Sequence, residues 1–177
     1  MLFRSAESMA IAHGLSITRS RSVRSSEWPV AVIEAGAAGI GTGGTGAAAG
    51  DTHDADTRAD DVLSAVVDAV ASDRAIDELG TIAVIASESL VGAVTERLSG
   101  RFGADVGRGA AGLSRAVAVL TPQESKGLEF DAAIVVEPQQ IIDEITRGAA
   151  ALYVAMTRPT QRLHLVTSTA LPAGIVS

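Results

Sequence analysis

Short runs of β-branched and small apolar residues alternate with helical patterns along most of this chain. The runs at 81–86, 115–121 and 132–136 have the length and composition of strands that are buried on both faces. Apolar residues at helical spacing lie between and around these runs. The alternation predicts an α/β fold in which a parallel sheet is covered by helices on both faces, with ligands at the carboxyl ends of the strands.

The helical segments carry start and stop signals that predict their limits. A helix over about 58–79 follows a threonine and has two aspartates in its first turn, where the helix dipole favours negative charge. Ser87 is expected to cap a second helix, which ends at Gly100. Further helical segments cover about 138–157, and a last strand is expected at 162–168.

The first part of the chain has weaker patterns. Residues 4–13 favour a short helix, and residues 28–33 favour a strand that a proline weakens near its start. We expect residues 1–34 to be a partial helix and strand region of the main domain. Residues 35–57, which begin with a long run of glycine and alanine, are expected to form a flexible connector, and residues 58–177 the main domain.

Composition excludes several classes of protein. The chain has 177 residues, 47% of them hydrophobic, which is enough to fill the core of one domain. A net charge of -7 argues against a free-standing nucleic-acid clamp, so any contact with nucleic acid must be local. There is no apolar run of the roughly 18 residues that span a membrane, and no secretion signal. The absence of cysteine and the scatter of three histidines favour a cytoplasmic protein without a metal site.

Two glycine patterns bear on nucleotide binding. Gly39, Gly41 and Gly44 satisfy the dinucleotide pattern G-x-G-x-x-G, but no helix pattern opens directly behind them, so we do not favour an NAD(P)-dependent oxidoreductase. A Walker A loop needs a lysine after its last glycine. The only lysine of the chain, Lys126, precedes Gly127, which excludes a Walker A loop.

Two further segments carry residues suited to chemistry. The polar segment 121–131 lies between two predicted strands, where Gly127 permits close backbone approach and Lys126 and Glu129 place opposite charges beside it. On its own, an ordinary connecting turn would explain this segment. The apolar helix near residue 155 ends at Arg158, which could cap the helix or present a guanidinium to a phosphoryl group in a cleft.

Taken together and in order, these segments resemble a known family. SKGLEFD at 125–131 and LYVAMTRPTQRL at 152–163 resemble motifs V and VI of superfamily 1 helicases of the UvrD/Rep type, in their second RecA-like domain. The resemblance covers about residues 81–167. Within that superfamily, the sequence is most similar to the actinobacterial helicase-like ATPases that recycle RNA polymerase. The resemblance implies the C-terminal half of an ATP-dependent DNA helicase or translocase, with a RecA-like fold of the P-loop NTPase type.

The resemblance also implies roles for particular residues. Arg158 would be the arginine finger that reaches the γ-phosphate of ATP bound on the preceding RecA-like domain. Glu129 would accept a hydrogen bond from the ribose, and Gly127 would let the loop pass close to the nucleotide. Thr121 and Gln123 would contact the nucleic-acid backbone. Gln123 stands where the family commonly has histidine.

A fainter similarity concerns the N-terminus. Phe3, Arg4 and Ser5 resemble motif IV of the family, which would make Arg4 a second phosphate-sensing arginine. The interval between Arg4 and Thr121 is too short for the large 2B subdomain of UvrD-type helicases.

Without Walker A and B motifs, the chain holds only one wall of an ATP site. It should not hydrolyse ATP alone, and an N-terminal RecA-like domain, normally in the same chain, would hold the ATP and its Mg²⁺. Besides this domain, the implied partners are DNA and RNA polymerase, while a preference for DNA over RNA is left open. The alternative function is a non-catalytic RecA-like module that binds RNA polymerase or another protein.

Overall fold

The computed structural model describes residues 2–15, 30–36 and 55–175, with the side chains from Ala6 onward. Most of the predicted connector, residues 37–54, lies outside this part of the chain. The helices are α1 (Leu2–Ala12), α2 (Ala55–Ile76), α3 (Glu88–Phe102), η1 (Gly103–Asp105, a 3-10 helix), α4 (Gly109–Gly112), α5 (Pro138–Glu144) and α6 (Gly148–Met156). The strands are β1 (Ala31–Glu34), β2 (Ile82–Ile85), β3 (Val106–Arg108), β4 (Val117–Leu120), β5 (Phe130–Val136) and β6 (Pro159–Thr167).

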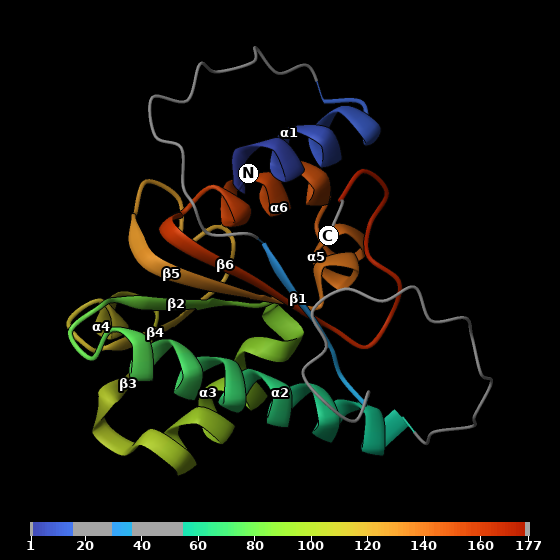
Figure 1. Ribbon diagram of the computed structural model, residues 1–177. Coiled ribbons are helices and arrows are strands. Elements are labelled where there is room, and N and C mark those ends of the chain that lie inside the picture. Colours follow the sequence, from blue (N-terminus) through green and yellow to red (C-terminus); the bar gives the residue numbers. More distant parts are fainter. Residues whose placement is uncertain (1, 16–29, 37–54, 176–177) are drawn as a thin grey trace.

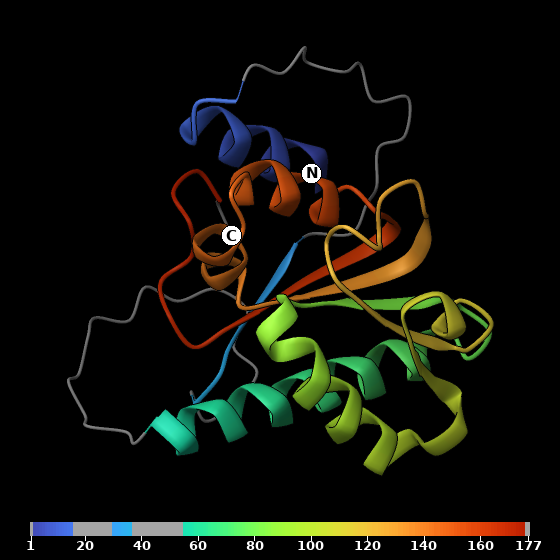
Figure 2. The same cartoon turned by 180° about the vertical axis from the view of Figure 1, so that it is seen from behind.

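The six strands form one parallel sheet in the order β1-β6-β5-β2-β4-β3. Helices α2 and α3 cover one face, and α1, α5 and α6 cover the other (Figures 1 and 2). The predicted α/β fold, a parallel sheet with helices on both faces, is therefore confirmed.

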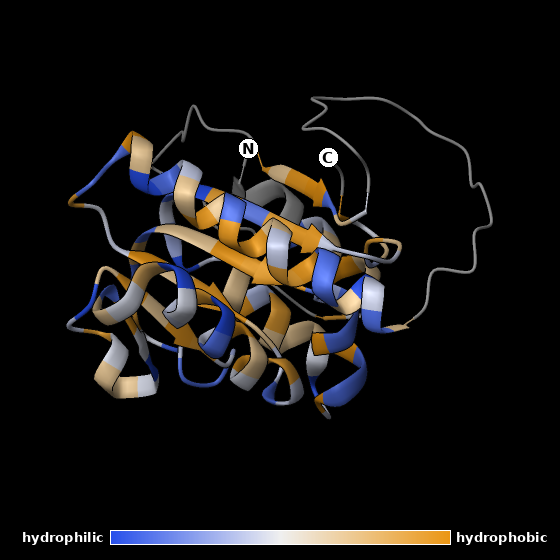
Figure 3. Ribbon diagram, turned by 90° about the horizontal axis from the view of Figure 1, so that it is seen from below, coloured by the Kyte–Doolittle hydropathy of each residue, from blue (hydrophilic) through white to orange (hydrophobic). Residues whose placement is uncertain are grey.

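Alternation along the strands divides the core into two layers. In β2, Ile82 and Val84 pack with α2 and α3, while Ala83 and Ile85 pack with the helices of the opposite face. All four residues are buried, which explains why the strand sequences are apolar at every position. Figure 3 shows these hydrophobic strands behind helices that carry hydrophilic residues on their outer side.

The structure corrects the limits of the first long helix. Helix α2 begins at Ala55, inside the predicted connector, and ends at Ile76 instead of Leu79. After it, the Asp77 carboxylate accepts a hydrogen bond from the backbone N–H of Leu79, and the backbone of Gly80 bonds to the Asp77 carbonyl. This tight turn takes the place of the last predicted helical turn.

The start signal of α3 differs from the prediction in one respect. Ser87 occupies the N-cap position of α3, but its hydroxyl makes no capping hydrogen bond and lies 3.0 Å from the hydroxyl of Ser89. The helical segments predicted over about 138–157 are confirmed as the two helices α5 and α6. At the start of the second, a Cβ on Gly148 would lie 2.2 Å from the carbonyl oxygen of Ile142, so close backbone packing separates the pair.

Strand β3 was not predicted, because the glycines in this region indicated a turn. The strand has only three residues, one of them Gly107, and gives no periodic signal. Glycine is needed there for close packing, since a Cβ on Gly112 would lie 2.4 Å from the carbonyl oxygen of Gly107. The same glycines that obscured the strand therefore allow the chain to fold back beside it.

Candidate functional site at the amino edge of the sheet

The polar segment 121–131 runs from one edge of the sheet to the other. Thr121 and Gln123 follow β4 at the carboxyl edge, whereas Gly127 and Glu129 precede β5 at the amino edge. The crossing is required because β4 and β5 are parallel and β2 lies between them. On the way, Leu128 packs against the core layer of α1, α5 and α6.

Arg158 precedes β6, whose amino end lies beside that of β5. The structure therefore brings Arg158 together with Gly127 and Glu129, about 30 residues away in sequence, and separates them from Thr121 and Gln123. Thr121 and Gln123 lie at the carboxyl ends of the strands, where ligand residues were expected. The three residues assigned to the nucleotide lie at the amino edge instead.

The Arg158 guanidinium is held between the end of α6 and the segment before β5. Its Nε donates to the carbonyl oxygen of Val154 at 3.0 Å, and its Nη1 donates to that of Leu128 at 3.1 Å. Nη2 donates to the Thr157 hydroxyl at 3.1 Å. Arg158 therefore caps its helix, as one interpretation predicted, and it also links motif VI to motif V. The side chain remains partly exposed at the edge.

The neighbouring loop leaves its backbone accessible. Gly127 is exposed and has φ +82°, a conformation that favours glycine, and no atom lies within 4 Å of the place that a Cβ would take. Glu129 is also exposed on this loop. One residue further, the backbone N–H of Phe130 donates to the carbonyl of Arg158 at 3.2 Å, which fixes the two segments side by side.

At the carboxyl edge, Thr121 and Glu124 form a reciprocal capping box. The Glu124 carboxylate accepts hydrogen bonds from the backbone N–H and the hydroxyl of Thr121, and the Thr121 hydroxyl accepts one from the backbone N–H of Glu124. Thr121 is only 7% exposed, whereas Gln123 is exposed. The T-x-x-E pattern at 121–124 is the local sequence signal for this pair.

Sequence reasoning also missed a polar network at the amino edge. Asp131 accepts hydrogen bonds from the backbone N–H of Thr81 at 2.8 Å, from the Thr81 hydroxyl at 2.9 Å and from Gln161 Nε2 at 3.1 Å. These hydrogen bonds, above all that from the Thr81 backbone, lower the pKa of Asp131 below its ordinary value of 3.8. No local signal could reveal partners that lie 50 and 30 residues away.

A buried charged cluster lies beneath α2. Asp73 is fully buried, and its carboxylate accepts a hydrogen bond from Arg162 Nε at 2.8 Å and lies 3.1 Å from His164 Nε2. Burial acts to raise the pKa of Asp73. The hydrogen bonds and charges of His164 and Arg162 together outweigh burial and lower the pKa below 3.8. Because the pair joins α2 to β6, it links two elements that are 89 residues apart.

We expect the free energy of unfolding to fall as the pH is lowered through 3.8 and below. The pKa of Asp73 is lower in the folded chain than in the unfolded chain, so the unfolded chain binds more protons in this range. Urea unfolding from about pH 7 to about pH 3 measures the effect. The Asp73→Asn variant lacks this carboxyl group and should lose less stability over the acid range. An identical pH dependence in both proteins would contradict the prediction.

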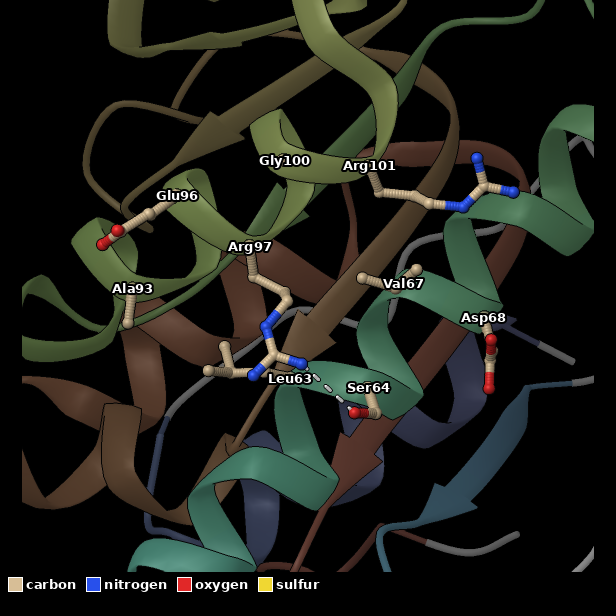
Figure 4. A pocket seen from close by; sticks show the side chains of 9 residues that line it. All are labelled: Leu63, Ser64, Val67, Asp68, Ala93, Glu96, Arg97, Gly100 and Arg101. Atoms are coloured by element: carbon tan, nitrogen blue, oxygen red, sulfur yellow. Dashed lines mark hydrogen bonds between the residues drawn. The ribbon is translucent and has the colours of Figure 1, made fainter.

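Two cavities in the described part lie away from Gly127, Glu129 and Arg158. A groove of about 730 Å³ runs between α2 and α3, and Arg97 crosses it to donate hydrogen bonds to Ser64 and Asp60 (Figure 4). A second cavity of about 660 Å³ lies at the carboxyl edge, between α2, α3, α5 and the segment after β6. Neither includes Gly127, Glu129 or Arg158.

Several predictions fall on residues that the structure does not describe. The backbone of Arg4 belongs to α1, but its side chain lies outside the described residues, as do Gly39, Gly41 and Gly44. Among the described residues, no three His, Cys, Asp or Glu side chains gather closely enough to hold a metal ion. No helix in this part of the chain is long and apolar enough to cross a membrane.

A parallel six-stranded sheet of this topology, covered by helices on both faces, has a RecA-like fold. The profile of the viral superfamily 1 RNA helicase core domain matches residues 54–167. The chain belongs to this family, and the matched residues include both motif segments.

A solved structure of a helicase domain agrees with the fold. The C-terminal domain of a possible DNA helicase from Lactobacillus plantarum WCFS1 is 20% identical, with a TM-score of 0.63 over 99% of this chain and 88% of that chain. The SWI2/SNF2 ATPase core of Sulfolobus solfataricus in complex with dsDNA is 16% identical, with a TM-score of 0.47 over 61% of this chain and 25% of that chain. No curated protein sequence matches the chain.

Proposed function

We propose that the chain is the C-terminal RecA-like domain of an ATP-dependent DNA helicase or translocase. In this proposal it completes an ATP site whose phosphate loop and Mg²⁺ belong to a first RecA-like domain. The observation that carries the proposal is the meeting of Gly127, Glu129 and Arg158 at one edge, with Arg158 bonded to the carbonyl between the other two. These residues fit the outer side of a bound nucleotide, because they offer an accessible backbone, an exposed carboxylate and a guanidinium.

Each residue then has a definite task. Arg158 turns from the Leu128 carbonyl toward the γ-phosphate and neutralises the negative charge that develops during phosphoryl transfer. Glu129 accepts a hydrogen bond from the ribose hydroxyls. Gly127, which has no side chain, lets the loop pass close to the nucleotide. Hydrolysis reopens the interface between the domains, since the contact that Arg158 makes with the γ-phosphate is lost.

Exposed apolar side chains at the same edge support docking of another domain. Among the described residues, the large hydrophobic side chains classed as exposed are Ile11, Ile76, Leu79 and Leu113. The last three precede β2 or β4 at the amino edge, and Leu79 is 94% exposed. Leu79 in particular is almost fully exposed, so a partner that covered it would bury apolar surface and gain binding free energy. A first RecA-like domain bound there would cover it and face Arg158.

We expect Leu79→Glu to weaken association with a separately supplied first RecA-like domain by about tenfold or more, because a charge replaces an apolar contact at the interface. Isothermal titration with and without a non-hydrolysable ATP analogue measures this affinity. Ile11→Glu, a change of a half-exposed residue on α1, is the matched control and should have no effect. ATP analogue should strengthen association of the wild-type chain. An affinity that ignores nucleotide would favour the non-catalytic module instead.

We further propose that nucleic acid binds locally at the carboxyl edge. Gln123 is an exposed polar residue there, while the Thr121 hydroxyl is occupied by Glu124 and would act by holding the turn. The specific similarity to UvrD/Rep enzymes and to ATPases that recycle RNA polymerase remains a prediction. Binding assays with purified RNA polymerase and with single-stranded DNA and RNA test it.

A further inference from the structure

The pairing of β5 with β6 is irregular beside the end of α6. Phe130 pairs with Pro159. The next pair along the strands joins Ala132 to Arg162, so that two residues of β6 lie opposite one residue of β5. A bulge of this kind bends the strand and redirects its side chains. It lies directly after Arg158, at the amino edge.

Side chains close this bulge and tie three strands together. Gln161, one of the two extra residues of β6, donates from Nε2 to Oδ1 of Asp131, the residue opposite, at 3.1 Å. The other carboxylate oxygen of Asp131 accepts from the backbone and the hydroxyl of Thr81, which precedes β2. The amino ends of β6, β5 and β2 are therefore linked through the single carboxylate of Asp131.

The network is anchored in the core. Arg162 Nη1 donates to Oε1 of Gln161 at 3.2 Å, and its Nε donates to the buried Asp73 at 2.8 Å. Arg162 is 5% exposed and Asp73 is fully buried, so this end of the network has little freedom to move. Gln161 is thus held at both ends of its side-chain amide.

We propose that Gln161 is a positioning residue for Arg158. Bonded to Asp131 and Arg162, it keeps the bulge in place and thereby the pairing of Phe130 with the main chain of Arg158. The backbone of Arg158 is then fixed while its guanidinium turns between the Leu128 carbonyl and a phosphate. The inference rests on the proposed function, in which Arg158 acts on ATP.

The first test uses NMR of the 177-residue chain, which needs no activity. In Gln161→Ala, the backbone amide and the Nε–Hε signal of Arg158 should shift and broaden, because the bulge is no longer held. Gln140→Ala is the matched control. It removes a glutamine that donates to Ser89 at 2.9 Å and to Glu144 at 2.6 Å at the carboxyl edge, and should leave the Arg158 signals unchanged. Unchanged Arg158 signals in Gln161→Ala would overturn the inference.

The second test uses the chain together with its first RecA-like domain. Gln161→Ala should lower kcat for ATP by about tenfold or more while KM changes less than about twofold, because a misplaced group affects the transition state more than binding. Gln140→Ala should keep the wild-type kcat. If the wild-type protein hydrolyses ATP and Gln161→Ala does so equally well, the positioning role is wrong. If the wild type has no activity, the proposed function fails, and the NMR comparison alone decides whether Gln161 positions Arg158.

Discussion

Arg158→Ala is expected to lower ATP turnover by about 10³-fold or more in the protein that contains both RecA-like domains. The guanidinium would be lost from the place where charge develops on the γ-phosphate, and no other described basic side chain bonds to the Leu128 carbonyl. Nucleotide affinity should change far less, since the first domain holds the phosphates. Steady-state hydrolysis and titration with a fluorescent ATP analogue measure the two effects separately.

Arg147→Ala is the control for this experiment, because Arg147 is exposed and precedes the same helix at its other end. It should hydrolyse ATP at the wild-type rate. Arg158→Lys keeps the charge but loses the planar fork that reaches three acceptors, so it should recover little activity. Normal turnover in Arg158→Ala would rule out the arginine-finger role.

Asp73→Ala should destabilise the chain by about 3–5 kcal/mol, the cost of leaving a buried charge without its partner. The change leaves the guanidinium of Arg162, 5% exposed, without its carboxylate in the core layer beneath α2. The position of His164 beside the same carboxylate adds to the loss. Urea or thermal unfolding followed by circular dichroism measures the change.

Asp68→Ala provides the comparison on the same helix. Asp68 is exposed, and its removal should change the free energy of unfolding by less than about 0.5 kcal/mol. Equal stability of the Asp73→Ala and Asp68→Ala variants would show that the buried pair contributes little beyond the surrounding apolar packing.

The parts of the fold that could be predicted are those with a local signal. β2, β4 and β5 were visible because burial on both faces makes a strand apolar at every position, and α3 was visible through its apolar spacing. The short β3 has no such signal. The end of α2 was missed because the Asp77 carboxylate accepts a hydrogen bond from the Leu79 backbone and closes a turn. A side chain that bonds to the nearby backbone in this way competes with the helix, and the spacing of apolar residues does not reveal it.

The candidate site was predictable in its residues and not in its position. The motif segments identified Gly127, Glu129 and Arg158, but their meeting depends on β5 and β6 being neighbours in the sheet, which strand patterns do not reveal. The partners of Gln161 and Arg162 lie 30 and 89 residues away in sequence. Pairs of this kind follow from topology and cannot be derived from the neighbours of a residue in the chain.

The crossing of the sheet by residues 121–129 limits how this segment can evolve. Surface connections usually tolerate insertions and deletions, because few of their residues make specific contacts with the rest of the protein. Here the capping box of Thr121 holds one end, and the contact of Leu128 with Arg158 holds the other. Adding or deleting a single residue would displace either the hydrogen bonds of Thr121 at the carboxyl edge or the contact of Leu128 with Arg158 at the amino edge. The length of the segment is thus under stricter constraint than the identity of its exposed side chains.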